Sequence, residues 1–474
     1  MIIKNKQILK MLKKIYLPLL GLLSFTTWYF DILETHNILI YSTILIVMAS
    51  LGVSNTRLLF FTLFTVPANR TPYFLEFLDN KYFDLFGKNI TALNEYHTFL
   101  YIFVFIVLIF IMIIRAIKNK HKFKGKLALI VTSMTIYSFV TLIWTPSMPS
   151  GLSEIWFIVQ GYLVYLLIRN DNDKRNYSYE FSWFLSMLLL VISLQYFKSY
   201  YDYFVSIEQP TSFFKYWKIE GKKAIKLWAN PNILAAVFGI SLVPSFYKYV
   251  DKKRSKLVYL FIPFELLIIY AIFLTKSQGM YYSLLVGLLF IPLLFIQNKK
   301  TLYFLIASAV VLFAGGMAFI VRVEEIFPKL YDMFNDFTTN RIDIYKEAIM
   351  LLRNPHTLIF GMGVGSDRTV LTADFFHSWF FQVLVTRGIV GMSLVALMIY
   401  FVVEILFDNK DRIRYFIAVA IIIYLAHGIT DSGFDYQHIG VIFYFMVAFL
   451  EKRIQPQGSE FHLVRNIKKH KSKL

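Results

Sequence analysis

Apolar runs long enough to cross a lipid bilayer recur along almost the whole of this 474-residue chain, and they limit its fold more than any other feature. A helix needs about 20 mostly apolar residues to span the hydrocarbon core. Within that layer, only structures that satisfy their backbone hydrogen bonds internally are stable. Hydrophobic residues make up 57% of the chain and aromatic residues 18%, which excludes an ordinary soluble globular protein. We therefore predict an all-α integral membrane protein.

The sequence predicts about 12–14 transmembrane helices. The expected spans lie near residues 15–32, 38–54, 58–75, 97–115, 127–145, 153–168, 181–204, 233–249, 257–274, 279–297, 301–320, 388–407, 413–430 and 438–451. The first run precedes further spans and lacks a small-residue cleavage site, so we expect it to be a span and not a cleaved signal peptide. The expected organisation is one polytopic membrane domain over residues 1–452 and a basic tail over residues 453–474.

The net charge of +19 follows the expected topology. Basic residues gather before the first span, in alternate loops and in the tail, as in Lys4 to Lys14, Arg115 to Lys126, Lys248 to Lys256, Lys299 and Lys300, Arg412 and Arg414, and Lys468 to Lys473. Placing these segments in the cytoplasm satisfies the positive-inside rule and puts both termini there. We therefore expect a multi-pass protein of the cytoplasmic membrane, with basic residues against anionic lipid headgroups and no nucleic-acid partner.

One expected outer loop, residues 205–229, departs from this charge pattern. It carries five lysines, namely Lys215, Lys218, Lys222, Lys223 and Lys226. Two interpretations stay open: a long loop in which basic residues are tolerated, or a basic patch that binds an anionic ligand outside the cell.

The sequence offers little for metal chemistry. It contains no cysteine, which excludes disulfides, thiol catalysis and cysteine-based metal sites. Asp171-Asn172-Asp173 resembles a metal-nucleotide motif of sugar-nucleotide transferases, but the expected topology puts it in the cytoplasm, away from the other polar motifs. No other group of carboxylates and histidines has clear metal-ligand spacing. We expect neither a metal nor another cofactor.

Two polar turns are expected on the outer side, each at the start of a span. In Asn230-Pro231-Asn232, Asn230 suits an N-cap and Pro231 suits the first helical position. The same helix start can also bind an anion. Lys276-Ser277-Gln278-Gly279 is a tight turn between two spans that offers an amine, a hydroxyl and an amide. Each motif therefore has a structural explanation beside the functional one.

The large outer loop, residues 321–376, is expected to contain an amphipathic helix. Ile342, Tyr345, Ile349 and Leu352 recur at helical spacing. Thr339 or Asn340 can cap this helix, and Asn354-Pro355 ends it. Arg341 falls in its first turn, where a cation is unfavourable to the helix dipole, and a residue in a poor local position is a candidate for function. The glycines at 361, 363 and 365 do not have the spacing of a dinucleotide-binding motif.

The segment Asp374-Phe375-Phe376-His377-Ser378-Trp379 places an aspartate and a histidine where this loop returns to the membrane. A span that began at His377 would put Arg387 near mid-membrane at high cost. We therefore predict that the span begins near Gly388 and that residues 377–387 line a cavity at the outer surface. Asp431 and Asp435 lie in the last outer hairpin, where they orient a base or a sugar, or are simply solvated.

These motifs follow one another in a fixed order. The sequence has NPN before a span, SxG after one, R-x-D-I-Y-x-E-A in the loop, P-x-x-x-x-x-G-x-G-x-G, H-S-W-F-F-Q and G-I-V-G. Together, over roughly residues 225–450, they resemble the bacterial O-antigen ligase and polymerase family. The resemblance implies a multi-span, metal-independent membrane glycosyltransferase of GT-C-like architecture. Such proteins act outside the cytoplasmic membrane on glycans linked to a polyprenyl diphosphate.

The resemblance also implies roles for individual residues. The family's histidine at the junction of loop and membrane matches His377, and its arginine at the start of the loop helix matches Arg341; both are expected to be catalytic. The expected substrate-binding residues are Asn230, Asn232, Lys276, Ser277, Gln278, Asp374 and Asp431. Gln278 departs from the family, which often has arginine there, so Lys276 or the lysines of the loop 205–229 would have to compensate.

Three functions remain open at this point. We favour a polymerase that joins undecaprenyl-diphosphate-linked repeat units into a capsular, exopolysaccharide or teichuronic-type polymer. The many Lys, Ile, Asn, Phe and Tyr residues suggest an AT-rich genome and a Gram-positive host, which has no lipopolysaccharide core to accept a finished chain. The alternatives are an O-antigen ligase and a non-enzymatic flippase for lipid-linked oligosaccharides. A flippase is expected to line a path with charges inside its spans, whereas this sequence keeps most charges in loops. Expected partners are the lipid-linked glycan donor and acceptor, the bilayer and other polysaccharide-assembly membrane proteins.

Overall fold

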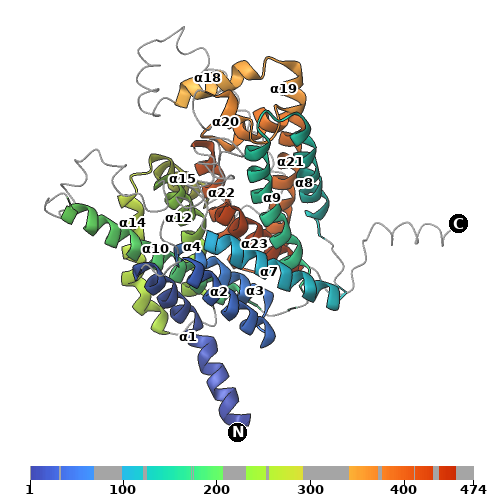
Figure 1. Ribbon diagram of the computed structural model, residues 1–474. Helices are drawn as coiled ribbons and strands as arrows, with labels where there is room; N and C mark the ends of the chain where they lie inside the picture. Colours follow the sequence, from blue (N-terminus) through green and yellow to red (C-terminus); the bar gives the residue numbers. More distant parts are fainter. Residues whose placement is uncertain are drawn as a thin grey trace.

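The computed structural model describes residues 2–30, 34–68, 99–120, 125–171, 173, 176–206, 231–251, 256–291, 341–371, 376–409, 411–430 and 437–454. Every regular element in these ranges is a helix, which confirms the prediction of an all-α membrane protein. Figure 1 shows the long helices side by side in a bundle, with three shorter helices, α18, α19 and α20, lying across one end of it.

The first half of the chain supplies one group of helices. Its elements are α1 (Ile2–Tyr29), α2 (Glu34–Ser50), α3 (Asn55–Leu63), α4 (Thr65–Ala68), α7 (Phe99–Lys118), α8 (Ala128–Thr141), the 3-10 helix η3 (Leu142–Trp144), α9 (Met148–Arg169) and α10 (Ser178–Ser206). The predicted span near 58–75 is broken among the described residues, because α3 ends at Leu63 and the short α4 follows. Both helices are buried in the bundle and do not form a lipid-facing span.

The second half supplies the remaining helices. They are α12 (Pro231–Ser245), α13 (Tyr247–Val250), η4 (Lys256–Phe261), α14 (Ile262–Leu274), α15 (Gln278–Phe290), α18 (Arg341–Leu351), α19 (Pro355–Phe360), α20 (Asp367–Val370), α21 (Trp379–Asp408), α22 (Ile413–Thr430) and α23 (Gln437–Ile454). Pro231 is the first residue of α12, and Lys276 to Gln278 form the turn before α15, as the sequence predicts. The expected span near 301–320 lies outside the described residues.

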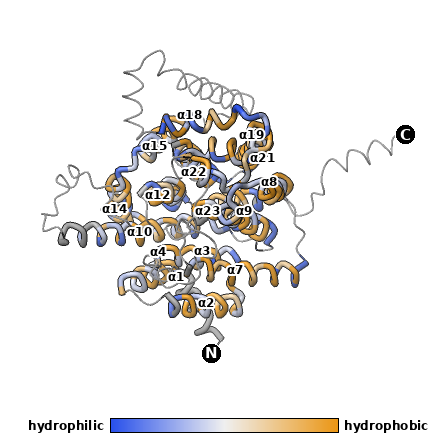
Figure 2. Tube along the Cα trace, turned by 45° about the horizontal axis from the view of Figure 1, so that its top comes forward, coloured by the Kyte–Doolittle hydropathy of each residue, from blue (hydrophilic) through white to orange (hydrophobic). Residues whose placement is uncertain are grey.

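Length and composition separate the described helices into two groups. Five are long and apolar enough to cross a membrane: 100–118, 148–169, 178–199, 232–250 and 379–408. Further apolar helices are shorter, at 36–50, 128–144, 258–274, 278–290 and 413–429. Figure 2 shows hydrophobic residues along most of the bundle, and hydrophilic residues gather at helix ends and around α18 and α19. On α7, Phe110 and Ile117 point their large side chains outward, as expected of helices that contact lipid.

Aromatic side chains and small residues hold the bundle together. Phe60 of α3 stacks on Phe184 of α10, with ring centroids 4.3 Å apart. Gly161 of α9 lies against the ring of Tyr444 on α23, where a methyl group would clash with the ring. Close packing of this kind supports helix association in a membrane, because lipid tails are as apolar as the helices and the hydrophobic effect does not drive helices together there.

Several charges lie inside the bundle, and two basic residues that the sequence predicts in loops are among them. Lys248, expected in a cytoplasmic loop, is fully buried in α13. Its ammonium group is paired with Glu265 of α14 and also donates to the hydroxyl of Ser186, 2.5 Å away. Arg115, likewise expected in a loop, donates to backbone carbonyls at the end of α2. The prediction was wrong because a single sequence does not reveal partners that neutralise a charge inside a helical bundle.

Candidate functional site

The helix α18 begins at Arg341, lies across one end of the bundle (Figure 1) and contacts α21. Arg341 is the first residue of α18, and Tyr345 follows one turn later on the same face. The ring of Tyr345 stacks on Phe381 of α21, with centroids 4.9 Å apart and planes inclined by 25°. The hydroxyl of Tyr345 lies 3.4 Å from the carbonyl oxygen of His377 and 3.2 Å from that of Ile429. One tyrosine therefore connects the arginine helix to the histidine segment.

An apolar cluster fixes α18 in this position. Ala348 of α18 is fully buried against Phe376, Phe381 and Val385, and Ile344, Ile349 and Leu352 pack around them. This face of α18 is the amphipathic face that the sequence predicts. The expected end of the helix at Asn354 is also confirmed: α18 ends at Leu351, and the side chain of Asn354 then caps α19 by accepting from the backbone N–H of His356, 2.9 Å away.

His377 has an unusual backbone conformation. Its φ is 48°, in the left-handed region that non-glycine residues seldom adopt. Such a conformation costs about 1–3 kcal/mol, and residues held in it cluster at functional sites. The chain then straightens at Ser378, and α21 starts at Trp379, whose indole N–H donates to the carbonyl of Leu425 at 3.0 Å. Trp379 also packs against Gly428, so the histidine segment lies at the end of α22.

The second group of predicted residues lies at the starts of α12 and α15. Asn232 is in the first turn of α12. Ser277 is the N-cap of α15 and is 2% exposed, Gln278 follows it, and Lys276 has a φ of 51°. Both helices pack on α22, because Gly239 and Gly287 each lie against Ile423. The structure therefore joins this group to the histidine segment through α22, whose last turns contact Tyr345 and Trp379.

Several predicted features lie outside the described residues. These are Asn230, Asp374, Asp431, Asp435 and the lysines of the loop 205–229. Their roles stay predictions. Residue 431 follows the last residue of α22 directly, two positions after the carbonyl of Ile429 that Tyr345 contacts.

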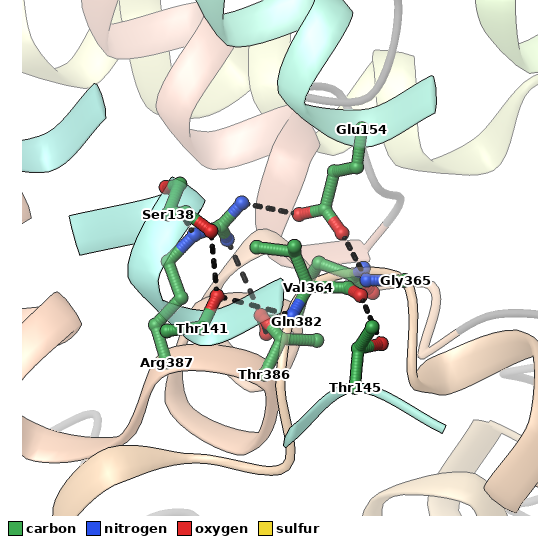
Figure 3. Close-up of polar contacts among 9 residues, drawn as sticks. All are labelled: Ser138, Thr141, Thr145, Glu154, Val364, Gly365, Gln382, Thr386 and Arg387. Atoms are coloured by element: carbon green, nitrogen blue, oxygen red, sulfur yellow. Dashed lines mark hydrogen bonds and ion pairs between the residues drawn. The ribbon is translucent and has the colours of Figure 1, made fainter. Parts of the chain in front are cut away.

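The predicted start of the span near Gly388 coincides with a break between two helical segments. The helix α21 begins nine residues earlier, at Trp379, and runs to Asp408 with a break in its helical geometry at Gly388, where φ is 64° and ψ is −167°. Arg387 is buried immediately before this break. Its guanidinium lies 2.5 Å from Glu154 of α9 and also donates to Ser138 of α8 at 3.1 Å (Figure 3). A carboxylate from the first half of the chain thus neutralises the arginine that the sequence could not place.

Two residues near this end of the bundle were not singled out by sequence. Tyr345 lies inside the motif R-x-D-I-Y-x-E-A, and a polar aromatic residue one turn after Arg341 was the available signal. His427 is buried in the last turn of α22, two residues before Ile429. Nothing in the sequence indicates where a histidine in an apolar helix lies relative to His377. Among the residues that the structure describes, no group of three His, Asp or Glu side chains is placed to hold a metal ion.

Fold and site together define the class: a multi-pass helical membrane protein with polar residues gathered at one end of its bundle, beneath the helices of a large loop. Residues 264–396 match the family model described as O-antigen ligase. The matched region includes Lys276, Ser277, Gln278, Arg341 and His377, and it supports the resemblance to the O-antigen ligase and polymerase family. The curated proteins contain no match to the chain.

Proposed function

We propose that this protein is a membrane glycosyltransferase that polymerises undecaprenyl-diphosphate-linked oligosaccharide repeat units into a surface polysaccharide. The observation that carries the proposal is the contact of Tyr345 with the His377 carbonyl, because it places the helix of Arg341 beside the histidine. The match of residues 264–396 to the O-antigen ligase family model supports a membrane protein that processes glycans. The polymer would be a capsule, an exopolysaccharide or a teichuronic-type polymer.

In the proposed reaction, a hydroxyl of one repeat unit attacks the anomeric carbon of a second glycan. The new glycosidic bond forms as the bond from that carbon to the diphosphate oxygen breaks, and undecaprenyl diphosphate leaves with both electrons. The hydroxyl proton passes to neutral His377, which acts as general base. The diphosphate is already a good leaving group, so the reaction needs neither a nucleotide nor a metal.

Cations at the site would stabilise the leaving group. Arg341 can bind two phosphate oxygens at once through its planar fork, and Lys276 supplies a second positive charge. The starts of α12 and α15 add backbone N–H groups that favour anions, and Asn232, Ser277 and Gln278 lie at these helix starts. Asn230, Asp374 and Asp431 would complete the substrate site in this proposal.

The proposed location is the outer face of the cytoplasmic membrane, with both termini in the cytoplasm. The basic segments of the sequence support this orientation. Donor, acceptor and product would therefore all lie outside the cytoplasm, beside the bilayer and other polysaccharide-assembly proteins.

An O-antigen ligase is the second candidate, because residues 264–396 match a family described as O-antigen ligase. A ligase transfers a finished chain to a separate acceptor, whereas a polymerase lengthens the lipid-linked chain. Deletion of the gene, followed by sizing of the lipid-linked glycan, separates the two. Single repeat units on the lipid support the polymerase, and long lipid-linked chains that fail to reach an acceptor support the ligase.

The flippase is the third candidate. The buried charges weaken the sequence argument against it, which is that most charges lie in loops. Charges do lie inside the described helices, but Arg387 and Lys248 are held in ion pairs by Glu154 and Glu265. Breaking such a buried pair is costly, so both ion pairs are expected to hold their helices together. The test supplies purified protein in vesicles with a fluorescent polyprenyl-diphosphate sugar. Transfer of this lipid across the vesicle membrane without lengthening of its glycan would favour a flippase over an enzyme.

A further inference from the structure

The glycine loop, residues 361–365, joins the outer-loop helices to the first half of the chain. Gly361, Gly363 and Gly365 all have positive φ, from 74° to 94°. A Cβ atom at any of the three would lie 2.3–2.7 Å from backbone atoms of a neighbouring segment. These glycines therefore allow the backbone of the loop to touch the backbone of other elements, a role unrelated to nucleotide binding.

On one side, the glycine loop is bonded to α21. The break at Gly388 leaves carbonyl groups that an unbroken helix would engage in its own ladder. The N–H of Met362 donates to the carbonyl of Val385 at 2.8 Å, and the N–H of Gly363 donates to that of Thr386 at 3.0 Å. The hydroxyl of Tyr137 on α8 lies 3.1 Å from the carbonyl of Arg387. The loop and α8 thus satisfy the broken end of the segment that begins beside His377.

On the other side, the loop is bonded to the region around α8 and α9. The indole N–H of Trp144 donates to the carbonyl of Gly361 at 3.1 Å, and the hydroxyl of Thr145 donates to that of Val364 at 2.7 Å. The N–H of Gly365 donates to Glu154 at 2.7 Å. None of these contacts involves the residues proposed to bind substrate.

Glu154 is the residue that joins both sides. One of its oxygens accepts from Gly365, and the other pairs with Arg387, as Figure 3 shows. Arg387 is also held by the hydroxyls of Ser138 and Thr386, at 3.1 and 3.2 Å. Both charged side chains are about 10% exposed, so water does not screen their attraction as it would at a surface.

We propose that Glu154 and Arg387 are positioning residues, which lock the glycine loop and the first segment of α21 to α8 and α9 and thereby hold Arg341 and His377 in register. The inference rests on the proposed function for its effect on the reaction, but the lock itself is a property of the fold. Only Ser378 separates His377 from the segment 379–387, and Arg387 ends this segment. The α18 helix, with Arg341, is connected to the glycine loop through α19.

The kinetic test compares three variants of purified full-length protein supplied with lipid-linked repeat units. Glu154→Leu removes both contacts, whereas Glu154→Gln keeps an oxygen that can accept from Gly365. Glu265→Leu is the matched control, because it also strands a buried cation but at a distance from the glycine loop. A misplacement of about 1 Å can cost roughly 100-fold in rate. We expect kcat per folded molecule to fall at least tenfold in Glu154→Leu and less in Glu154→Gln.

The control separates positioning from loss of stability. Glu265→Leu should lower the melting temperature as Glu154→Leu does, yet keep kcat within about twofold of the wild type. KM for the repeat unit should change less than kcat in the Glu154 variants, because the groups that bind substrate remain. Equal kcat values in Glu154→Leu and Glu265→Leu would overturn the proposal. If Glu154→Leu does not fold, Glu154→Gln is judged by the same comparison.

A distance measurement tests the connection made by Glu154 and Arg387 independently of enzyme activity. The chain has no cysteine, so spin labels attach only at introduced cysteines. Met350 on α18 and Leu129 on α8 are exposed and provide the pair of labelling positions. We expect a broader distance distribution in Glu154→Leu than in Glu265→Leu. An unchanged distribution overturns the lock, and a broadened one supports it even if the protein proves not to be a polymerase.

Discussion

Replacing Gly388 with alanine tests the break in α21 that the arrangement of the site depends on. The backbone of Gly388 has a φ of 64° and a ψ of −167°, a region that essentially only glycine adopts. Holding an alanine there costs about 1–3 kcal/mol. The added methyl group would also lie 2.3 Å from the carbonyl oxygen of Ile359 and 2.6 Å from the nitrogen of Phe360. Such overpacking against backbone costs about 1–3 kcal/mol more.

The two terms give a loss of about 2–6 kcal/mol in the free energy of unfolding of Gly388→Ala. The matched control is Gly440→Ala in α23, where a Cβ atom would meet nothing within 4 Å. Alanine is a better helix former than glycine by up to about 1 kcal/mol, so the control should be neutral or slightly stabilising. The assay is thermal unfolding in detergent, followed by tryptophan fluorescence, with both variants beside the wild type. A melting temperature of Gly388→Ala equal to that of Gly440→Ala would refute the reasoning.

Three further predictions concern the donor site, the buried charges and the chemistry. Arg341→Lys should lower kcat/KM for the lipid-linked donor by roughly tenfold or more, because the bidentate fork is lost while the charge remains. The control Arg353→Lys, at an exposed arginine, should leave kcat/KM unchanged. Equal kcat/KM values in both variants would show that Arg341 does not bind the donor. Glu265→Leu should destabilise the protein by about 3–5 kcal/mol by stranding Lys248, and adding Lys248→Met should restore most of that loss in the same unfolding assay. Activity should survive EDTA, because the proposed reaction uses no metal; loss of activity on chelation that magnesium restores would contradict the mechanism.

The sequence predicts helices and their ends well where local chemistry determines them. The start of α12 at Pro231, the turn before α15 and the helix that begins at Arg341 all follow from spacing, capping and turn residues. The amphipathic face of α18 is also predictable from the sequence, because its apolar residues recur at helical spacing. In the structure they pack around the buried Ala348. Local rules therefore place the candidate residues on their elements.

Long-range pairing is what the sequence does not reveal. Glu154 and Arg387 are 233 positions apart, and either residue alone looks like a charge that should avoid the membrane. That cost predicts a span that begins near Gly388, where the structure has the break in α21, but the sequence does not reveal the partner that neutralises Arg387 in the helical segment before the break. Lys248 was misplaced for the same reason. The contact of Tyr345 with His377 likewise depends on how α18 folds back onto α21, which no local pattern determines.

The central claim is that His377 accepts a proton while Arg341 holds the diphosphate of a lipid-linked glycan. The most direct measurement is the rate of glycosidic bond formation by purified protein, with defined undecaprenyl-diphosphate repeat units and products sized by gel or mass spectrometry. The account predicts a ladder of longer lipid-linked chains and free undecaprenyl diphosphate with the wild type. It predicts a rate at least 100-fold lower with His377→Ala, within the range of about 10²–10⁴ expected for loss of a general base. A full ladder at the wild-type rate from His377→Ala would contradict the account.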